Sequence, residues 1–195
     1  MRDPVLPSVT LTTHRLLLRP FVPGDAADVH AVWQDARFID SAPLGYAYAG
    51  AAFDVALGWC ATGIEDRRRT GKGIGFAVTA RDGGRLVGHV SLFGADWIAM
   101  TAEMHYWTAP WARGRGVAAE AAAAVARWAL TEQGFARIAL QAAPANTASR
   151  HVAERAGFQP EGVLRNVAVS RSGRHDLVMY SLIPSDLAAG RPPGV

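Results

Sequence analysis

The sequence predicts one mixed α/β domain whose sheet contains both parallel and antiparallel strand pairs. Three features of the strand and helix order support this prediction. A short apolar strand precedes two helical segments, and three strand-like segments then follow one another with only turns between them. Beyond these, helices and strands alternate up to a final pair of strands. Turns join antiparallel strands, whereas a helix between two strands favours a parallel pair, so both kinds are expected.

The length and composition suit a single domain. The chain has 195 residues, of which 50% are apolar and 19% are charged, as is ordinary for a globular protein. We expect the domain to cover residues 11–187, with flexible tails at 1–10 and 188–195. The N-terminus has no signal-peptide core, and no run of 18 residues lacks polar interruption. A cytoplasmic location without a membrane partner is therefore predicted.

The N-terminal half is predicted to contain one strand and two helices. Residues 15–19 form a short apolar run that a proline stops, which is typical of a strand. Asp25 is the candidate N-cap of a helix over 25–36. After an aromatic, loop-like stretch at 40–50, a second helix is expected over 51–69. The residues expected on its buried side are Phe53, Leu57 and Ile64.

The second half is predicted to be richer in strands. The expected strands cover residues 74–79, 86–93, 102–108, 137–142, 162–170 and 176–183. A hairpin turn at 82–84 separates the first two. Helices are expected over 117–133, which is rich in alanine, and over 147–156, and a glycine follows each.

The charged and sulfur-containing residues exclude several classes of function. The net charge of +3 is small for this length, Lys72 is the only lysine, and the one dense arginine cluster covers 67–69. Such a cluster is most often a solvated helix face, so no nucleic-acid partner is expected. Cys60 is the only cysteine, which excludes an intramolecular disulfide and a Cys-rich metal site. We predict a buried structural thiol there, and no metal.

A glycine-rich segment opens the alanine-rich helix. Residues 113–118 follow Pro110, with glycines at 114 and 116 and arginines at 113 and 115. The first turn of a helix leaves N–H groups without partners and carries positive potential. Glycines let an anion approach these groups, and the arginines add positive charge. The segment therefore predicts a cradle for a pyrophosphate. An exposed glycine-rich turn is the alternative that these six residues leave open.

Other phosphate-binding motifs do not fit this segment. A Lys-Ser or Lys-Thr pair of the P-loop type does not follow, and no GxGxxG occurs. The segment instead resembles the Arg/Gln-x-x-Gly-x-Gly/Ala motif of the GNAT superfamily of N-acetyltransferases. The RimJ/RimL-like branch, which acetylates the N-termini of ribosomal proteins, is the group that the remaining sequence resembles. The matching segments are Asn146 to Ser149, Glu154 to Phe158, Glu161-Gly162, 13–19 and 176–182. The resemblance covers roughly residues 11–187.

The resemblance implies a GNAT fold with acetyl-CoA as the acetyl donor. This fold is a mixed, mostly antiparallel sheet flanked by about four helices, in which two central parallel strands splay apart. These strands would be 102–108 and 137–142, and backbone groups near Trp107 and Thr108 would bind the pantetheine and polarise the thioester. Asn146 would bond the pantetheine arm, or cap the following helix, or do both. The residues implied to hold the pyrophosphate are Arg113, Gly114, Arg115, Gly116, Val117 and Ala118.

The resemblance also implies candidate catalytic residues. Many GNAT proteins carry a tyrosine that protonates the departing thiol, but the matching position here is Ala153. In the RimJ/RimL-like branch a serine can stand in, and Ser149 occupies that place, although a helix-capping role is equally open. Glu103 and His105 alternate onto one face of their strand, where either could take the proton of the amine or serve only as a structural hydrogen-bonding group.

The acceptor is expected to be a primary amine, either a protein N-terminus or a small molecule. Residues that could line its entry are Asp40, Tyr46, Tyr48 and Trp97. A catalytically weak acyl-CoA-binding or regulatory module is an alternative, as is an acyltransferase that uses a longer donor such as succinyl-CoA. A homodimer is the default expectation for the oligomeric state.

Overall fold

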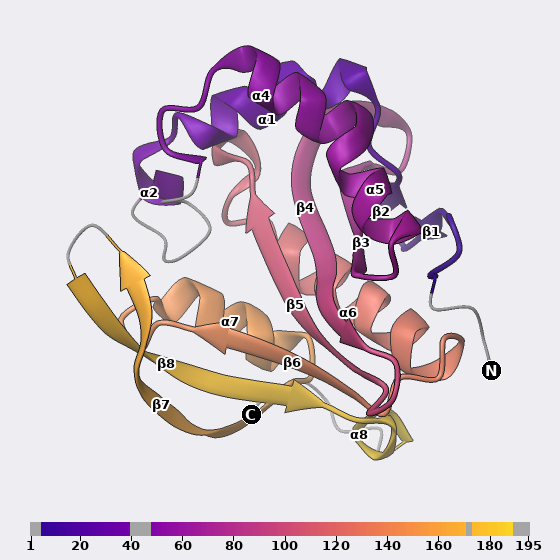
Figure 1. Cartoon of the computed structure of the whole chain (residues 1–195), viewed down its shortest axis with the longest axis vertical. Coiled ribbons are helices and arrows are strands. Elements are labelled where there is room, and N and C mark those ends of the chain that lie inside the picture. The colour runs from indigo at the N-terminus through magenta and orange to yellow at the C-terminus, as the bar shows by residue number, and fades with distance from the viewer. Residues whose placement is uncertain (1–4, 40–47, 171–172, 189–195) are drawn as a thin grey trace.

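The described part of the chain forms one eight-stranded sheet with helices on both faces (Figure 1). The computed structural model describes residues 5–39, 48–170 and 173–188. The strands stand in the order β1-β2-β3-β4-β5-β6-β8-β7. Their bounds are Leu11–Thr12 for β1, Leu16–Arg19 for β2, Gly73–Ala80 for β3, Gly83–Asp96 for β4, Thr101–Thr108 for β5, Arg137–Ala142 for β6, Gln159–Ser170 for β7 and Gly173–Leu182 for β8.

The strand directions confirm the predicted mixed sheet. β5 and β6 pair in parallel, and the other neighbouring strands pair antiparallel. The parallel pair arises because α6 (Val117–Thr131) connects its two strands, as a crossover requires. The expected strands 102–108 and 137–142 are therefore the two that form the parallel pair at the centre of the sheet.

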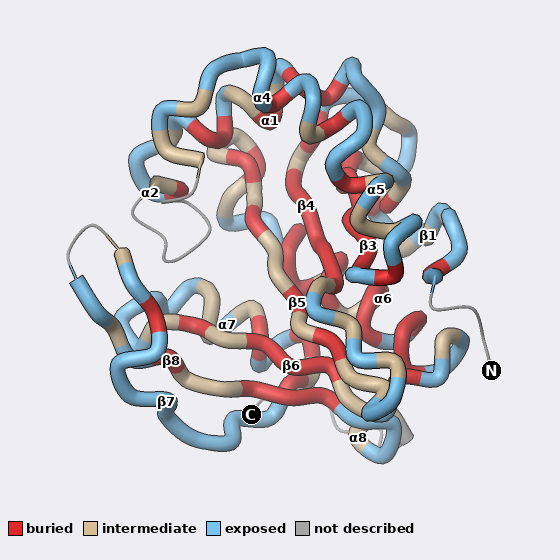
Figure 2. The backbone as a smooth tube through the Cα atoms, in the orientation of Figure 1, coloured by how far each residue is buried: buried red, intermediate tan, exposed pale blue. Residues whose placement is uncertain are grey.

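Two hydrophobic clusters lie on opposite faces of the sheet. The larger one packs α6 and α7 (Thr147–Arg155) against one face of the sheet. The strand residues of this cluster, which face the two helices, are almost fully buried (Figure 2). Buried alanines such as Ala122 and Ala126 let α6 approach the strands closely. The smaller cluster joins the other face to α1 (Ala26–Trp33) and α4 (Phe53–Gly58). Because successive strand residues point to opposite faces, β5 sends Met104 into the first cluster and Trp107 into the second.

The helix predicted over 51–69 is divided into three parts. α4 ends at Gly58, a π-helical turn covers Trp59–Gly63, and α5 covers Ile64–Arg69. The expected burial was wrong for Phe53 and Leu57, which are exposed, and right for Ile64. The buried residues are Ala56, Cys60 and Ile64. Their constant spacing of four fits the π turn, because its wider turn brings every fourth residue back to nearly the same face.

The helix predicted over 25–36 is also divided. It becomes α1 and a short α2 (Ala36–Ile39), preceded by a 3-10 turn at Pro23–Asp25. Asp25 does not cap α1 with its side chain. Its buried carboxylate instead accepts two hydrogen bonds of 2.8 Å from Arg19 and one from the N–H of Val22. This carboxylate therefore fixes the chain between β2 and α1.

Part of the expected N-terminal tail belongs to the core. The side chain of Leu6 is 1% exposed, and its carbonyl oxygen accepts a hydrogen bond of 2.6 Å from Arg68. At the other end, a short helix, α8 (Pro184–Ala188), follows β8. None of the helices among the described residues has the length and apolar character to cross a membrane.

The single cysteine of the chain, Cys60, is the buried thiol that its apolar context predicts. Cys60 is free and 3% exposed, on the π-helical turn. Burial raises the pKa of this thiol to about 12, so it stays protonated at neutral pH. A structural role for Cys60 follows from this environment.

Candidate active site

The parallel strands at the centre of the sheet separate halfway along their length. β5 and β6 pair from Thr101–Arg137 to Met104–Leu140. Beyond Met104, residues 105–108 still pair with β4 but have no strand partner on the β6 side within the described part of the chain, and the two strands diverge (Figure 1). Backbone groups on that side are therefore available to an extended ligand.

β5 leads directly to the start of α6. After Thr108 comes a 3-10 turn at Pro110–Ala112, then the two glycines, and α6 begins at Val117. Gly114 and Gly116 have φ of 75° and 73°, a left-handed conformation that favours glycine. No side chain caps Gly116. A Cβ at Gly114 would meet nothing within 4 Å, so the space around this turn is open.

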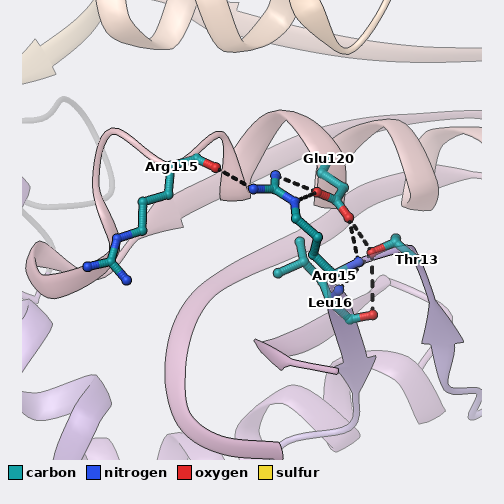
Figure 3. A network of polar contacts seen from close by, with 5 residues as sticks. All are labelled: Thr13, Arg15, Leu16, Arg115 and Glu120. Carbon is teal, nitrogen blue, oxygen red and sulfur yellow. Dashed lines mark hydrogen bonds and ion pairs between the residues drawn. The ribbon is translucent and has the colours of Figure 1, made fainter. Parts of the chain in front are cut away.

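An arginine in the bend between β1 and β2 holds the glycine-rich turn in place (Figure 3). Arg15 donates a hydrogen bond of 2.9 Å from Nη1 to the carbonyl oxygen of Arg115, and its Nε lies 2.7 Å from Glu120 Oε2. Glu120, in the first turn of α6, also accepts a bond of 2.6 Å from the hydroxyl of Thr13. A Cβ at Gly116 would lie 3.5 Å from Arg15 Nη2, so this guanidinium borders the turn. The network neutralises a carboxylate that would otherwise face the helix N-terminus.

The two arginines of the motif have different surroundings. Arg113 forms a two-pronged ion pair with Asp35, which precedes α2. Asp35 also accepts a hydrogen bond of 3.1 Å from the N–H of Phe38, and the Arg113 guanidinium lowers the pKa of its carboxyl group. Arg113 therefore ties the glycine-rich turn to the α1–α2 junction, and its charge is partly neutralised, which the sequence did not predict. Arg115 is exposed.

The start of α7 faces the diverging strands. Asn146 is its N-cap, and its side-chain oxygen accepts a hydrogen bond of 3.0 Å from the N–H of Ser149. This geometry confirms the capping role considered for Asn146. Tyr106 reaches across from β5, and its hydroxyl lies 2.8 Å from the carbonyl oxygen of Ser149 and 3.1 Å from Ser149 Oγ. Ala153, at the position for which the resemblance implied a tyrosine in many GNAT proteins, is fully buried.

Glu103 and His105 lie on the opposite face of β5 from Tyr106. Gln141 of β6 donates a hydrogen bond of 3.1 Å to Glu103 Oε2, and this bond joins the side chains of the two strands where they are paired. The ring of His105 packs at a tilt against the ring of Phe93, with the two centroids 3.9 Å apart. Burial, with the charge of Arg67, lowers the pKa of His105 to about 4. His105 is therefore neutral at physiological pH, and it is a weak base.

The residues expected to line the acceptor entry fall into three groups. Asp40 and Tyr46 lie outside the described residues. Tyr48 stacks on Trp33 of α1, with ring centroids 4.2 Å apart. Trp97 donates a hydrogen bond of 2.8 Å to the carbonyl oxygen of Gly71 and packs against Phe135. Trp97 precedes β5, at the end where β5 and β6 are paired, so the structure places it away from the diverging ends.

Sequence reasoning missed four residues that shape the site: Arg15, Asp35, Tyr106 and Gln141. The alternation along β5 was a usable signal for Tyr106, because Glu103 and His105 on one face require Tyr106 on the other. Partners of Arg15, Asp35 and Gln141 lie 38 to 105 positions away along the chain. No local pattern reports such long-range pairing. Among the described residues, no group of histidine, cysteine and acidic side chains could hold a metal ion.

Comparison with known families identifies the chain. The model of the acetyltransferase (GNAT) domain matches residues 15–159. The chain belongs to the GNAT acetyltransferase family. Its eight-stranded sheet with one diverging parallel pair is the fold that the resemblance implied.

A relative of known name also belongs with the acetyltransferases. The chain is 38% identical over 100 residues to YdaF of Bacillus subtilis (strain 168), a candidate ribosomal N-acetyltransferase. This match covers 51% of the chain and 55% of YdaF, so the chain matches about half the length of that relative.

Solved structures share the fold over nearly the whole chain. RimL, the ribosomal L7/L12 alpha-N-protein acetyltransferase solved with coenzyme A, superposes with a TM-score of 0.80 at 18% identity, covering 90% of this chain and 98% of RimL. The microcin C7 self-immunity acetyltransferase MccE, solved with acetyl-CoA and AMP, gives 0.79 at 19% identity, covering 92% and 98%. At these identities the likeness shows the fold.

Proposed function

We propose that this protein transfers the acetyl group of acetyl-CoA to a primary amine, first of all the N-terminal amine of a protein. One observation carries the proposal: the free edge of β5 at 105–108 leads directly to the uncapped start of α6. An extended arm that ends in a diphosphate matches this order of backbone edge and helix N-terminus. The protein-amine acceptor is supported by the names of YdaF and RimL.

The glycine-rich turn fits the diphosphate of CoA. The open space at Gly114 and the uncapped N-terminus of α6 leave room for phosphate oxygens near the amides of Val117 and Ala118. The helix dipole and the exposed Arg115 favour an anion there. Asn146 uses its side-chain oxygen to cap α7, so its NH₂ group would bond the pantetheine arm. When bound, acetyl-CoA supplies the activated thioester.

The chain's own groups would stabilise charge and move protons around that thioester. Backbone N–H groups near Trp107 and Thr108 would stabilise the developing oxyanion. Glu103, on the face of β5 that carries Trp107, would take the proton of the attacking amine, directly or through water. The neutral His105 would shape this side of the site. Ser149, on the other face, would donate a hydrogen bond to the departing sulfur.

An assay of thiol release tests the proposal. Wild-type protein is incubated with acetyl-CoA and an amine panel: peptides with a free N-terminal serine, alanine or methionine, and spermidine. We expect release of CoA only when an amine is present, with mass spectrometry showing one added acetyl group per acceptor. CoA binding without turnover of any amine supports the catalytically weak module instead. Faster turnover with succinyl-CoA than with acetyl-CoA supports the longer donor.

A further inference from the structure

The hydroxyl of Tyr106 joins the two sides of the diverging strands. Tyr106 lies on β5 two residues beyond the last parallel pair with β6, and its side chain packs on the face covered by α6 and α7. Its hydroxyl contacts both the carbonyl oxygen and the side-chain oxygen of Ser149, at 2.8 and 3.1 Å. The sequence assigned no role to this residue, and the roles proposed above for β5 and α7 do not use it.

The chemistry of these two contacts fixes the direction of each hydrogen bond. A carbonyl oxygen only accepts, so the phenol donates its single proton to the Ser149 carbonyl. The phenol oxygen then accepts, and the hydroxyl of Ser149 donates to it. Burial raises the pKa of the Tyr106 hydroxyl above its usual range, so the phenol keeps its proton at physiological pH. With its N–H bonded to Asn146, Ser149 is held through its backbone and its side chain.

Neither Ala153 nor Tyr180, two other residues at this part of α7, makes an equivalent contact with Ser149. Ala153, one turn after Ser149, is fully buried. A second phenol, Tyr180, also reaches α7, but it accepts a hydrogen bond of 3.1 Å from Arg150 and lies 3.4 Å from Glu154. Of these two phenols, Tyr106 is therefore the one that contacts Ser149.

We propose that Tyr106 is a positioning residue that orients the Ser149 hydroxyl toward the sulfur of the departing thiol. This inference rests on the proposed function. With sulfur beside Ser149, the phenol turns its proton from the carbonyl oxygen to Ser149 Oγ, which lies within hydrogen-bond distance in the resting protein. The Ser149 hydroxyl is then free to donate to sulfur. Donors linked in a chain polarise one another, so the serine becomes a better donor than it is alone.

The proposed reaction balances, and neither Ser149 nor Tyr106 loses a proton in it overall. The amine nitrogen forms a bond to the acetyl carbon, the carbon–sulfur bond breaks, and its electron pair stays on sulfur. The amine nitrogen loses one proton to the base on the other face of β5, which passes it to solvent, and the sulfur takes up one proton from solvent while Ser149 donates a hydrogen bond to it. Ser149 and Tyr106 end with the protons they had at the start. A phenol that holds its proton so firmly suits this role, because it orients Ser149 without ionising.

The test compares Tyr106→Phe with Ser149→Ala and with the double variant. Phenylalanine keeps the packing of the ring and removes the hydroxyl. Because the Ser149 hydroxyl loses the hydrogen bond that orients it toward the sulfur, we expect kcat to fall about 10- to 100-fold. The KM for acetyl-CoA should stay within about twofold of wild type, since the lost interaction forms in the transition state. The double variant should be no slower than Ser149→Ala alone, because Tyr106 acts through Ser149.

Tyr180→Phe is the matched control. It removes a phenol hydroxyl that contacts α7 but not Ser149, so kcat should stay within about twofold of wild type. The free energy of unfolding should change by about as much as it does in Tyr106→Phe. The amine that turns over fastest in the panel serves as acceptor, and calorimetry with CoA measures donor binding for each variant.

Three outcomes overturn the inference. An unchanged kcat in Tyr106→Phe, with a wild type that binds CoA and acetylates amines, overturns it while the proposed function stands. Losses in Tyr106→Phe and Ser149→Ala that add in the double variant show that the phenol does not act through the serine. A wild type that neither binds CoA nor turns over any amine overturns both the proposed function and the role of Tyr106.

Discussion

The donor side and the acceptor side of the candidate site are built differently. The proposed donor side consists of backbone groups at the edge of β5 and at the start of α6, a 15-residue helix packed in the main core. The proposed acceptor side consists of side chains from the other face of β5 and from the α1–α2 region. A site made of backbone is set by glycines and by the helix start. A site made of side chains depends on long-range packing, which varies more readily between relatives.

The strongest test of the donor side is Gly116→Asp. Gly116 has a left-handed φ of 73°, and an aspartate there brings a carboxylate to the proposed diphosphate position. We expect calorimetry to show a loss of CoA affinity of at least about 100-fold, because two like charges would share the helix N-terminus. Gly50→Asp is the matched control, since Gly50 has a φ of 75° and open space around it. Equal losses in both variants would point to backbone strain rather than to the cradle.

The face of the sheet that carries His89 of β4 and His105 of β5 should be the acid-sensitive part of the fold. Burial lowers the folded-state pKa of His89 to about 3 and that of His105 to about 4. Between these values and about 6.5 the unfolded chain binds more protons, so stability is full above about pH 6.5 and falls below it. We expect each histidine to cost about 2 kcal/mol between pH 7.5 and pH 5.

Urea unfolding at pH 7.5, 6 and 5 measures this effect. Replacing either histidine by glutamine should make the free energy of unfolding depend less on pH, by up to about one proton each. Gln substitution at His14, which is exposed, is the control and should leave the slope unchanged. A wild type equally stable at pH 5 and pH 7.5 would contradict the buried, neutral state of these rings.

A smaller effect is expected from Arg15→Gln. Arg15 is half exposed, so its ion pair with Glu120 contributes little to stability. Its removal leaves the Glu120 carboxylate unneutralised beside the start of α6, and we expect CoA affinity to fall about fivefold, or about 1 kcal/mol. Arg137→Gln breaks a comparable pair with Glu161 at the paired end of β5 and β6, and it should leave the affinity for CoA unchanged. A larger loss in the control would remove the proposed role of Arg15.

The smallest expected effect concerns the link between the two sides. Asp35→Asn keeps the hydrogen bond to the N–H of Phe38 and removes the charge that pairs with Arg113. We expect CoA affinity to stay equal or rise slightly, because Arg113 becomes free to face the diphosphate. The KM for the amine acceptor should rise about threefold as the α1–α2 junction loosens. A fall in CoA affinity without a change in acceptor KM would show that Arg113 serves only the turn.

The secondary structure on the proposed donor side could be predicted from the sequence, whereas the long-range side-chain contacts of the proposed acceptor side could not. The strand, turn and helix around Gly116 follow from local signals: a proline, two glycines and a run of alanines. The partner of Arg113 was missed because Asp35 lies 78 positions away. Trp97 was expected near the acceptor, yet its indole bonds Gly71 at the paired end of β5. The π-helical turn after α4 was missed because an α-helix and a π turn share the same apolar residues.

Backbone amide signals measured by NMR during a titration with CoA show whether the start of α6 binds the diphosphate. We expect the amides of Gly114, Gly116, Val117 and Ala118 to shift most, followed by those of residues 105–108, and we expect Gly116→Asp to abolish these shifts. Shifts confined to other parts of the chain, or no shifts at saturating CoA, would contradict the claim that the start of α6 binds the diphosphate.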